Sequence, residues 1–352
     1  MKKSWRVAGI AAIYIGTVVG AGFASGQEIW EFFTRFGTRG ALGLVLSTTV
    51  LIYLGTKSIL WGMMIKARSY KDFLYKVAGE RLGTLGDWTM SVFLFFLTGV
   101  MLAGAGAVAV GQGLKWEIGC WGTIILAVFV LSQRLNGIRG VNLVVIPLLF
   151  FTALMLQVKE VSIITWRPPA VNGNLWVIAA FQYSGYNLFL SLPVLVTLHQ
   201  IESDPVVLKW GGVLGGFALG VLAFLFYRAI MGMPRSIVEL PLMSLIKSWG
   251  RGWGWVYAFV LWGELFSTLV AHVFGLAARL GLVKSRRYLL YLSIIMVLPV
   301  LISGFGFARL VRVIYPLFGV ISILILIPLG IKPLPSVKIE KKYDRKGRIF
   351  TV

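Results

Sequence analysis

The stretch Gly16-Thr-Val-Val-Gly-Ala-Gly-Phe-Ala-Ser-Gly26 lies in the middle of the first long apolar segment and decides the fold. Its four glycines weaken a helix, because each is about 1 kcal/mol less favourable than alanine. Inside a membrane, irregular backbone persists only where protein buries it or where it lines a cavity. The stretch therefore indicates either a broken transmembrane helix or a close helix–helix contact, since Gly16/Gly20 and Gly22/Gly26 have the small-xxx-small spacing.

The composition of the chain is that of a membrane protein. Its 352 residues are 58% hydrophobic and 13% charged. The charged residues separate apolar runs close to the ~20 residues that cross a ~30 Å hydrocarbon core. Ten such runs are expected, at residues 7–33, 39–62, 88–113, 118–133, 140–158, 174–199, 207–229, 255–279, 287–305 and 309–331. We predict an all-α polytopic membrane protein with one transmembrane domain, residues 1–331, and a basic cytoplasmic tail, residues 332–352.

The net charge of +21 orients the chain and does not indicate a nucleic-acid partner. Most Lys and Arg residues fall on the side of the N-terminus, so the positive-inside rule places both termini in the cytoplasm of a bacterial cell membrane. The excess charge also suits anionic headgroups of the lipid bilayer. The start of the chain has the charged head of a signal peptide, but its apolar stretch runs on through Phe33, so we expect it to be retained. Cys120 is the only cysteine, which leaves no disulfide and no Cys-based transition-metal site.

The spans form two groups of five with similar connections. In each group the long connection follows the second span, at residues 63–87 and 230–254, and each contains an expected short helix, the first at 66–82. Five is an odd number, so the second group starts on the opposite side of the membrane. This predicts a 5+5 inverted repeat, about 7–158 and 174–331, in which spans 1 and 6 correspond.

The first span carries a signal for a helix restart. Ser25-Gly-Gln-Glu28 has the S-x-x-E spacing of a capping box, which marks the start of a helix. A restarted helix would direct its positive N-terminal end to the middle of the membrane, where it attracts an anionic group. We expect Gly20, Gly22 and the backbone of Phe23, Ala24 and Ser25 to bind that group.

The sixth span has its own polar interruption, Gln182-Tyr-Ser-Gly-Tyr-Asn187. It predicts a second discontinuous helix, with Tyr183, Ser184 and Asn187 recognising the rest of the solute and either Tyr183 or Tyr186 closing over it. The alternative is a polar contact between two helices.

The eighth span has one polar stripe, which includes Glu264, Ser267, Thr268 and His272. An acidic residue at this depth should face the bundle, so Glu264 is expected to support an ion site or carry a proton. The hydroxyls of Ser267 and Thr268 suit a hard cation, although such hydroxyls also bond to the preceding helical turn. His272 is either structural or part of a proton relay.

Together these features resemble the amino acid–polyamine–organocation superfamily, which has the LeuT fold. The stretch from Ile15 to Ile29 further resembles the YkvI-like family of bacterial membrane proteins. The resemblance implies that solute touches Gly20, Ala21, Gly22, Ser184 and Gly185. It also implies a sodium ion between the first span, at Gly16 and Val19, and the Ser267–Thr268 pair. Proton-coupled members instead have a lysine in span 5, and none stands between Val141 and Val158.

We therefore expect a cation-coupled symporter, with Na⁺ favoured over H⁺, for a small amino acid-like or organic-anion solute. Spans 1, 2, 6 and 7 would rock against spans 3, 4, 8 and 9. A ligand-sensing subunit that does not transport, as in germinant receptors, remains the alternative, and coupling stoichiometry and oligomeric state are left open. An enzyme is not expected, and no cofactor besides the coupling ion, because the chain lacks a phosphate-binding loop, an H-E-x-x-H motif and a G-x-S-x-G elbow.

Overall fold

The computed structural model describes residues 2–132, 151–152, 154–156, 174–233, 239–285, 287–334, 341–343 and 349–351. The longer helices are α1 (Lys3–Val18), α4 (Thr38–Met64), α5 (Tyr70–Gly111), α6 (Trp116–Ser132), α8 (Leu175–Leu195), α9 (Pro205–Met231), α11 (Arg251–Arg279), α12 (Tyr288–Val297) and α14 (Phe307–Ile331). The shorter elements are α2 (Ala21–Ser25), α3 (Gln27–Phe32), η1 (Thr34–Phe36), α10 (Pro241–Lys247), η3 (Leu198–Gln200), η4 (Leu282–Lys284) and α13 (Val300–Ser303). In the tail, β1 (Lys341–Tyr343) pairs antiparallel with β2 (Ile349–Thr351).

The helices follow the predicted apolar spans closely. Among the described residues, α4, α5, α9, α11 and α14 are long and apolar enough to cross a membrane. The expected span 140–158 lies almost entirely outside the described residues. The expected helix at 66–82 is continuous with the third span in α5, which bends at Gly79. Gly79 has φ of 85°, a backbone conformation that glycine adopts without steric cost.

The first span is interrupted twice. Val19 and Gly20 have extended backbone between α1 and α2, and Gly26, with φ of 80°, separates α2 from α3. The helix thus resumes at Ala21 and again at Gln27. The second restart directly follows Ser25-Gly26, and the Ser25 hydroxyl accepts from the backbone N–H of Gln27 at 3.2 Å and donates to the carbonyl of Gly22 at 2.8 Å. Glu28 does not complete a capping box, because its carboxylate faces α8.

The predicted break in the sixth span is also wrong, since α8 runs unbroken from Leu175 to Leu195. Its polar side chains bond within the helix. The Ser184 hydroxyl donates to the Ala180 carbonyl at 2.8 Å, and the Asn187 amide donates to the Tyr183 carbonyl at 3.0 Å. Gly185 serves close packing, because a side chain there would meet the backbone of Gly319 in α14.

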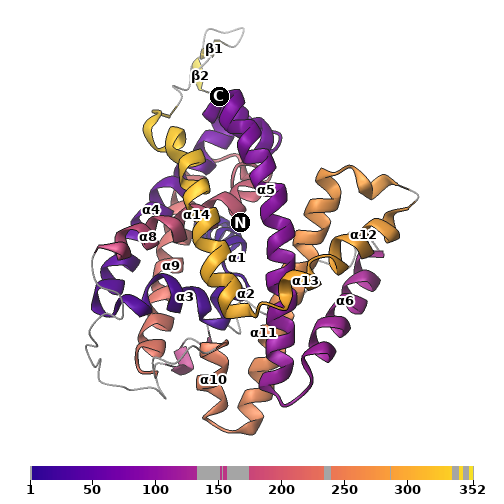
Figure 1. The fold of residues 1–352 in the computed structure, drawn as a ribbon. Coiled ribbons are helices and arrows are strands. Elements are labelled where there is room, and N and C mark those ends of the chain that lie inside the picture. The colour runs from indigo at the N-terminus through magenta and orange to yellow at the C-terminus, as the bar shows by residue number, and fades with distance from the viewer. Residues whose placement is uncertain are drawn as a thin grey trace.

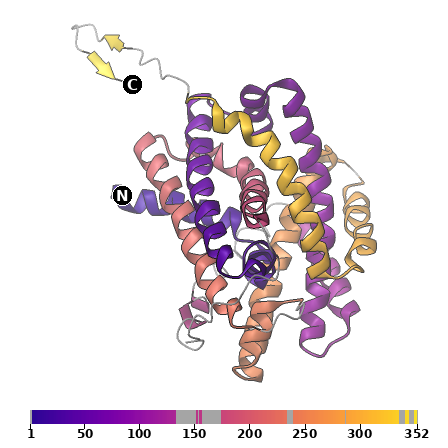
Figure 2. The ribbon, with the colours of Figure 1, turned by 60° about the vertical axis from the view of Figure 1, so that its left-hand side comes forward.

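The helices form two groups, joined by α14 (Figure 1). One group contains α1, α4, α8 and α9, which pack extensively on one another. The other contains α5, α6 and α11, with α12 and α13 beside them. Helix α14 packs on α8 and on α5, and so touches both groups. Figure 2 shows the N-terminal end of α1 projecting away from the other helices, consistent with the exposure of Lys3 and Trp5.

A row of glycines on α9 brings α1 and α4 close to that helix. A Cβ at Gly211 or Gly215 would lie within 3 Å of side chains of α1, and one at Gly212, Gly216 or Gly220 would do the same against α4. Such contacts allow the backbones of neighbouring membrane helices to approach closely. Side chains of α1 and α4 therefore pack directly on the backbone of α9 along this seam.

The N-terminal end of α1 is also tied to the segment before α9. Arg6 forms a two-pronged ion pair with Glu202, and Lys3 pairs with Asp204 at 3.1 Å. The hydrogen bond from Arg6 lowers the pKa of Glu202 below its usual value. Asp204 in turn caps α9 by accepting from the backbone N–H of Val206 at 2.9 Å.

The contact between α8 and α14 predicts a sharp difference between two Gly→Ala substitutions. A Cβ at Gly319 would lie 2.5 Å from the carbonyl oxygen of Gln182 and 2.7 Å from its Cα. Since backbone cannot move aside cheaply, Gly319→Ala should destabilise the protein by about 1–3 kcal/mol. Gly122→Ala, where no atom lies within 4 Å, is the control and should be neutral or slightly stabilising. Unfolding in detergent micelles measures both, and equal effects would contradict this description of the contact.

Candidate functional site

A cavity of about 560 Å³ extends along the interrupted first span, between the two helix groups. Its walls come from α1, α2, α5, α8, α11 and α14. The lining includes Gly16 to Gly22 on one side and the polar stripe of α11 on the other. This is the location at which irregular backbone is tolerated within a membrane protein, because the break faces a cavity rather than lipid.

Glu28 places a carboxylate in this cavity from α3. The residue is 4% exposed and lines the cavity wall. Its Oε2 atom accepts a hydrogen bond from the Tyr186 hydroxyl of α8 at 2.5 Å. Gly22 makes room for it, because a Cβ there would lie 2.1 Å from Oε1 of Glu28. The two breaks therefore fold α3 back so that its acid group covers α2 and bonds to α8.

Aromatic rings surround this carboxylate. Tyr186 and Tyr315 both line the cavity, and their ring centroids are 5.0 Å apart in an edge-on arrangement. Tyr186 also packs on Phe32 and Phe93, at 5.6 Å and 6.4 Å between ring centroids. This packing fixes the ring of Tyr186, and with it the direction of its hydroxyl toward Glu28.

The opposite wall is the polar stripe of α11. Ser267, Thr268, Glu264 and His272 all line the cavity. The Ser267 hydroxyl donates to the Glu264 carbonyl at 3.2 Å, so it bonds to the preceding turn. Oε2 of Glu264 and Nδ1 of His272 are buried without a hydrogen-bond partner among the described residues. Unpartnered polar atoms in a cavity are ready to bind a ligand, an ion or water.

Two polar contacts close the structure around α2 and α3. The Tyr257 hydroxyl of α11 donates to the Ala24 carbonyl at 2.5 Å. In α3, Glu31 is 1% exposed and pairs with Arg35 and with Arg312 of α14, the latter at 3.2 Å. This buried charge is compensated on two sides, in contrast to Glu28. The Glu31–Arg312 pair joins the first span directly to α14.

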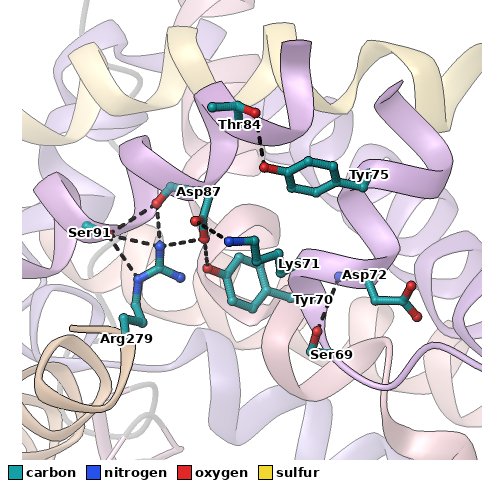
Figure 3. A network of polar contacts seen from close by, with 9 residues as sticks. All are labelled: Ser69, Tyr70, Lys71, Asp72, Tyr75, Thr84, Asp87, Ser91 and Arg279. Atoms are coloured by element: carbon teal, nitrogen blue, oxygen red, sulfur yellow. Dashed lines mark hydrogen bonds and ion pairs between the residues drawn. The ribbon is translucent and has the colours of Figure 1, made fainter. Parts of the chain in front are cut away.

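A polar network forms the other end of the cavity, where α11 meets α5 (Figure 3). Arg279 lines the cavity and donates to the carboxylate of Asp87 at 2.7 Å and to the Ser91 hydroxyl at 2.9 Å. Asp87 also accepts from the Tyr70 hydroxyl at 2.5 Å and from Lys71 at 3.1 Å. The guanidinium charge of Arg279 is therefore already matched by Asp87, 25% exposed, within the scaffold of α5 and α11.

The structure brings together most of the residues predicted from the sequence. The predicted residues that line the cavity are Gly16, Val19, Gly20, Ala21, Gly22, Asn187, Glu264, Ser267, Thr268 and His272. The predicted residues that do not are Phe23, Ala24, Ser25, Tyr183, Ser184 and Gly185, which are buried in helix contacts. Phe23, for example, packs on Phe226 at 5.6 Å, and Tyr183 packs on Phe33 at 4.9 Å.

Several lining residues were not among the predicted site residues. Glu28 was expected only as a capping residue, and Tyr186 was considered beside Tyr183 as a ring that closes over the solute but was left out of the predicted site. Tyr315 and Tyr70 carry no local signal, because a single tyrosine in an apolar span is as often packed as functional. Arg279 belongs to the stripe of α11, and its position four residues after Gly275 and seven after His272 indicated its face but not its partner.

The donor set does not suit a transition metal. Among the described residues, no group of three or more His, Cys, Asp or Glu side chains is placed to hold a metal ion. The hydroxyls of Ser267 and Thr268, the Glu264 carboxylate and the backbone near Gly20 are oxygen ligands, as hard cations require. A Cβ at Gly20 would lie 3.9 Å from Oγ1 of Thr268, so the break and the hydroxyl pair face each other.

Comparison with known proteins gives relatives by sequence and by structure. No protein-family model matches the chain. The uncharacterized membrane protein YkvI of Bacillus subtilis (strain 168) is 32% identical over 321 residues, which cover 89% of this chain and 92% of YkvI. Among solved structures, MhsT in complex with L-phenylalanine superposes with a TM-score of 0.65 at 17% identity, covering 90% of this chain and 88% of MhsT. A Na⁺-coupled sialic acid symporter gives 0.58 at 12% identity, covering 92% and 77%.

These similarities establish the fold. MhsT and the sialic acid symporter have the LeuT fold, and the agreement extends over nine-tenths of this chain. At these sequence identities the solved structures are evidence of the fold alone. The solutes that they bind are properties of those proteins.

The network in Figure 3 predicts a stability effect that depends on Asp87. Asp87→Asn removes the charge that Arg279 faces, while keeping one oxygen for the Tyr70 hydroxyl. We expect a loss of about 1–3 kcal/mol in the free energy of unfolding, because hydrogen bonds to charged groups are lost in a partly buried site. Glu80→Gln, an exposed position on the same helix, should change stability by less than about 0.5 kcal/mol. Unfolding in detergent tests both, and a neutral Asp87→Asn would mean that the network adds little stability.

Proposed function

Because the chain belongs to the YkvI-like family of bacterial membrane proteins, within the amino acid–polyamine–organocation superfamily, we propose that it is a cation-coupled secondary transporter of a small solute. The solute is amino acid-like or an organic anion, and Na⁺ is favoured over H⁺ as the coupling ion. The protein is not an enzyme and needs no cofactor besides that ion. Residues 1–331 act as one transport domain in the cell membrane, with both termini in the cytoplasm.

The observation that carries this proposal is the cavity at the interruption of the first span. It combines broken backbone, a hydroxyl pair and two buried carboxylates at the boundary between two groups of helices. Transporters with broken helices bind solute and ion at such a place, near the middle of the membrane. A purely structural helix contact would instead be filled by side chains and have its polar atoms paired.

The coupling cation would bind between the break and α11. Gly16 and Val19 would offer backbone carbonyls from the first span, and Ser267 and Thr268 their hydroxyls from the other side. Glu264 lies one turn earlier on the same face of α11, where its carboxylate would order the ion site or carry a proton in its place. The solute would occupy the neighbouring part of the cavity, against Gly20, Ala21, Gly22 and Asn187.

Alternating access follows from the two groups of helices. We propose that α1, α4, α8 and α9 move together against α5, α6 and α11, with α14 between them. The cavity extends from the break to Tyr70, Pro193 and Arg279, which the positive-inside orientation places toward the cytoplasm. The conformation is then inward-facing, and the Glu31–Arg312 pair closes the outer side.

The driving force is adequate for accumulation. One monovalent cation that moves down a membrane potential of ~150 mV contributes about 3.5 kcal/mol, equivalent to roughly 300-fold accumulation of solute. No solute site has to be unusually tight, because transport requires release as well as binding.

Uptake into proteoliposomes tests this function. Labelled amino acids and organic anions are offered under separate sodium and proton gradients, and we expect flux of at least one solute to depend on sodium. Ser267→Ala combined with Thr268→Ala should lower the sodium-dependent rate at least about tenfold, since two ligands of the ion are lost. The control is Thr49→Ala, whose exposed hydroxyl also bonds to the preceding turn but lies outside the cavity.

Two outcomes would count against the proposal in different ways. Sodium dependence that survives in the double variant would contradict the ion site. Ligand binding that stabilises the protein, without flux of any solute, would instead favour a ligand-sensing subunit.

A further inference from the structure

We propose that Glu28 is the receptor for a protonated amine of the solute, so that the cavity selects amine-bearing compounds and rejects organic anions that lack a basic nitrogen. The inference rests on the proposed function for the location of the solute, and it narrows the solute to one chemical class. It comes from the charge balance and the aromatic surroundings of this cavity.

Among the described residues, the Glu28 carboxylate has no cationic partner. All its polar contacts within the described residues come from one neutral group, the hydroxyl of Tyr186. Of its two oxygens, Oε1 accepts no hydrogen bond there, and the residue lines the cavity. A carboxylate 96% removed from solvent is costly unless a cation or a proton compensates it. An ammonium group in the cavity supplies that compensation and several N–H donors at once.

Helix α3 contains a second buried acid, Glu31, whose partners differ from those of Glu28. Glu31, one turn later in α3, is equally buried but is held by Arg35 and Arg312. The chain thus pairs a buried acid with arginine where the acid is structural. At Glu28, which faces the cavity, none of the described residues supplies such an arginine, so the negative charge is left for a group that enters the cavity.

The negative charges of the cavity lining are not balanced by positive charges of the described residues. Its ionisable groups include the acids Glu28 and Glu264, the imidazole of His272 and the guanidinium of Arg279. Arg279 is neutralised by Asp87, 2.7 Å away. Two carboxylates therefore remain without a matching cation among the described residues. A solute with only negative charge would meet repulsion at both, whereas a zwitterion or an amine would be attracted to Glu28.

Aromatic rings form the cavity wall around Glu28. Tyr186 and Tyr315 both face the cavity, with ring centroids 5.0 Å apart, and Tyr186 holds the carboxylate in place. Aromatic faces beside a carboxylate are suited to ammonium groups, because the ring quadrupole attracts cations. A site for a carboxylate would need free donors here, and the Tyr186 hydroxyl is already bonded to Glu28.

The test measures ligand binding separately from flux. Thermal unfolding of the purified full-length protein in detergent is followed with three matched sets of compounds at millimolar concentration: L-amino acids, the corresponding 2-hydroxy acids, and the corresponding primary amines without a carboxylate. We expect stabilisation by members of the amine-bearing sets and none by the hydroxy acids. In Glu28→Gln the dissociation constant for those ligands should rise by about 10- to 100-fold, because one charged contact is lost.

Two variants make the result specific. Glu28→Asp keeps the charge and should preserve the requirement for an amine, at reduced affinity. Glu117→Gln removes an acid from an exposed position in α6, outside the cavity, and should leave binding unchanged.

The inference is overturned if hydroxy acids stabilise as well as amino acids, if no amine binds at millimolar concentration, or if Glu28→Gln retains its affinity for amines. A pH dependence of transport abolished by Glu28→Gln, with amine affinity intact, would make Glu28 a proton carrier and likewise overturn it. Amine binding without flux would leave the inference standing and refute the transporter. Flux of hydroxy acids would do the reverse.

Discussion

The hydrogen bond from Tyr186 to Glu28 is the contact on which the arrangement of the site depends. It connects the interrupted first span to α8 across 158 residues of sequence. A buried acid group needs a donor, and this need fixes both the direction of α3 and the orientation of the tyrosine ring. Without the two interruptions, at Val19–Gly20 and at Gly26, the carboxylate could not turn back over Gly22 to reach it. The glycine-rich stretch is therefore required for the position of one acid group as much as for the flexibility of the helix.

The same contact lies at the boundary between the two groups of helices. On one side, α1 and α4 pack directly on the glycine backbone of α9, and on the other α5 and α11 are joined by the Arg279–Asp87 network. Helices α2 and α3 belong to neither group entirely, since Tyr257 of α11 binds Ala24 and Arg312 of α14 binds Glu31. The short helices after the break are thus attached to both sides, while α1 is attached to one. This difference in attachment allows a cavity beside α1 and keeps the structure beside α3 closed.

Sequence reasoning predicted the helices and the location of the site far better than it predicted the contacts within the site. Apolar length gave α4, α9 and α11 within a few residues, because lipid demands runs of about 20 apolar residues. The stripe of α11 was visible because helical periodicity places Glu264, Ser267 and Thr268 on one face. The errors share one cause. Ser184 and Ser25 bond to the carbonyls of their own helices, and no local pattern distinguishes that from a side chain directed into a cavity. Tyr186, Tyr315 and Asp87 acquire their roles from partners more than a hundred residues away, which periodicity does not identify. The ion and solute assignments of the cavity residues stay predictions.

The glycine seam of α9 has a mechanical consequence for the whole molecule. Side chains of α1 and α4 lie directly on the backbone of α9, because the seam glycines have no side chains whose rotamers could absorb a sliding or tilting movement. A tilt of α1 must therefore move α9, and the movement of α9 must in turn move α4. The extended residues Val19 and Gly20 are then the most flexible point of this unit. Bending there would alter the angle between α1 and the Glu28 carboxylate of α3. The shape of the cavity therefore depends on the tilt of α1, α4 and α9 together.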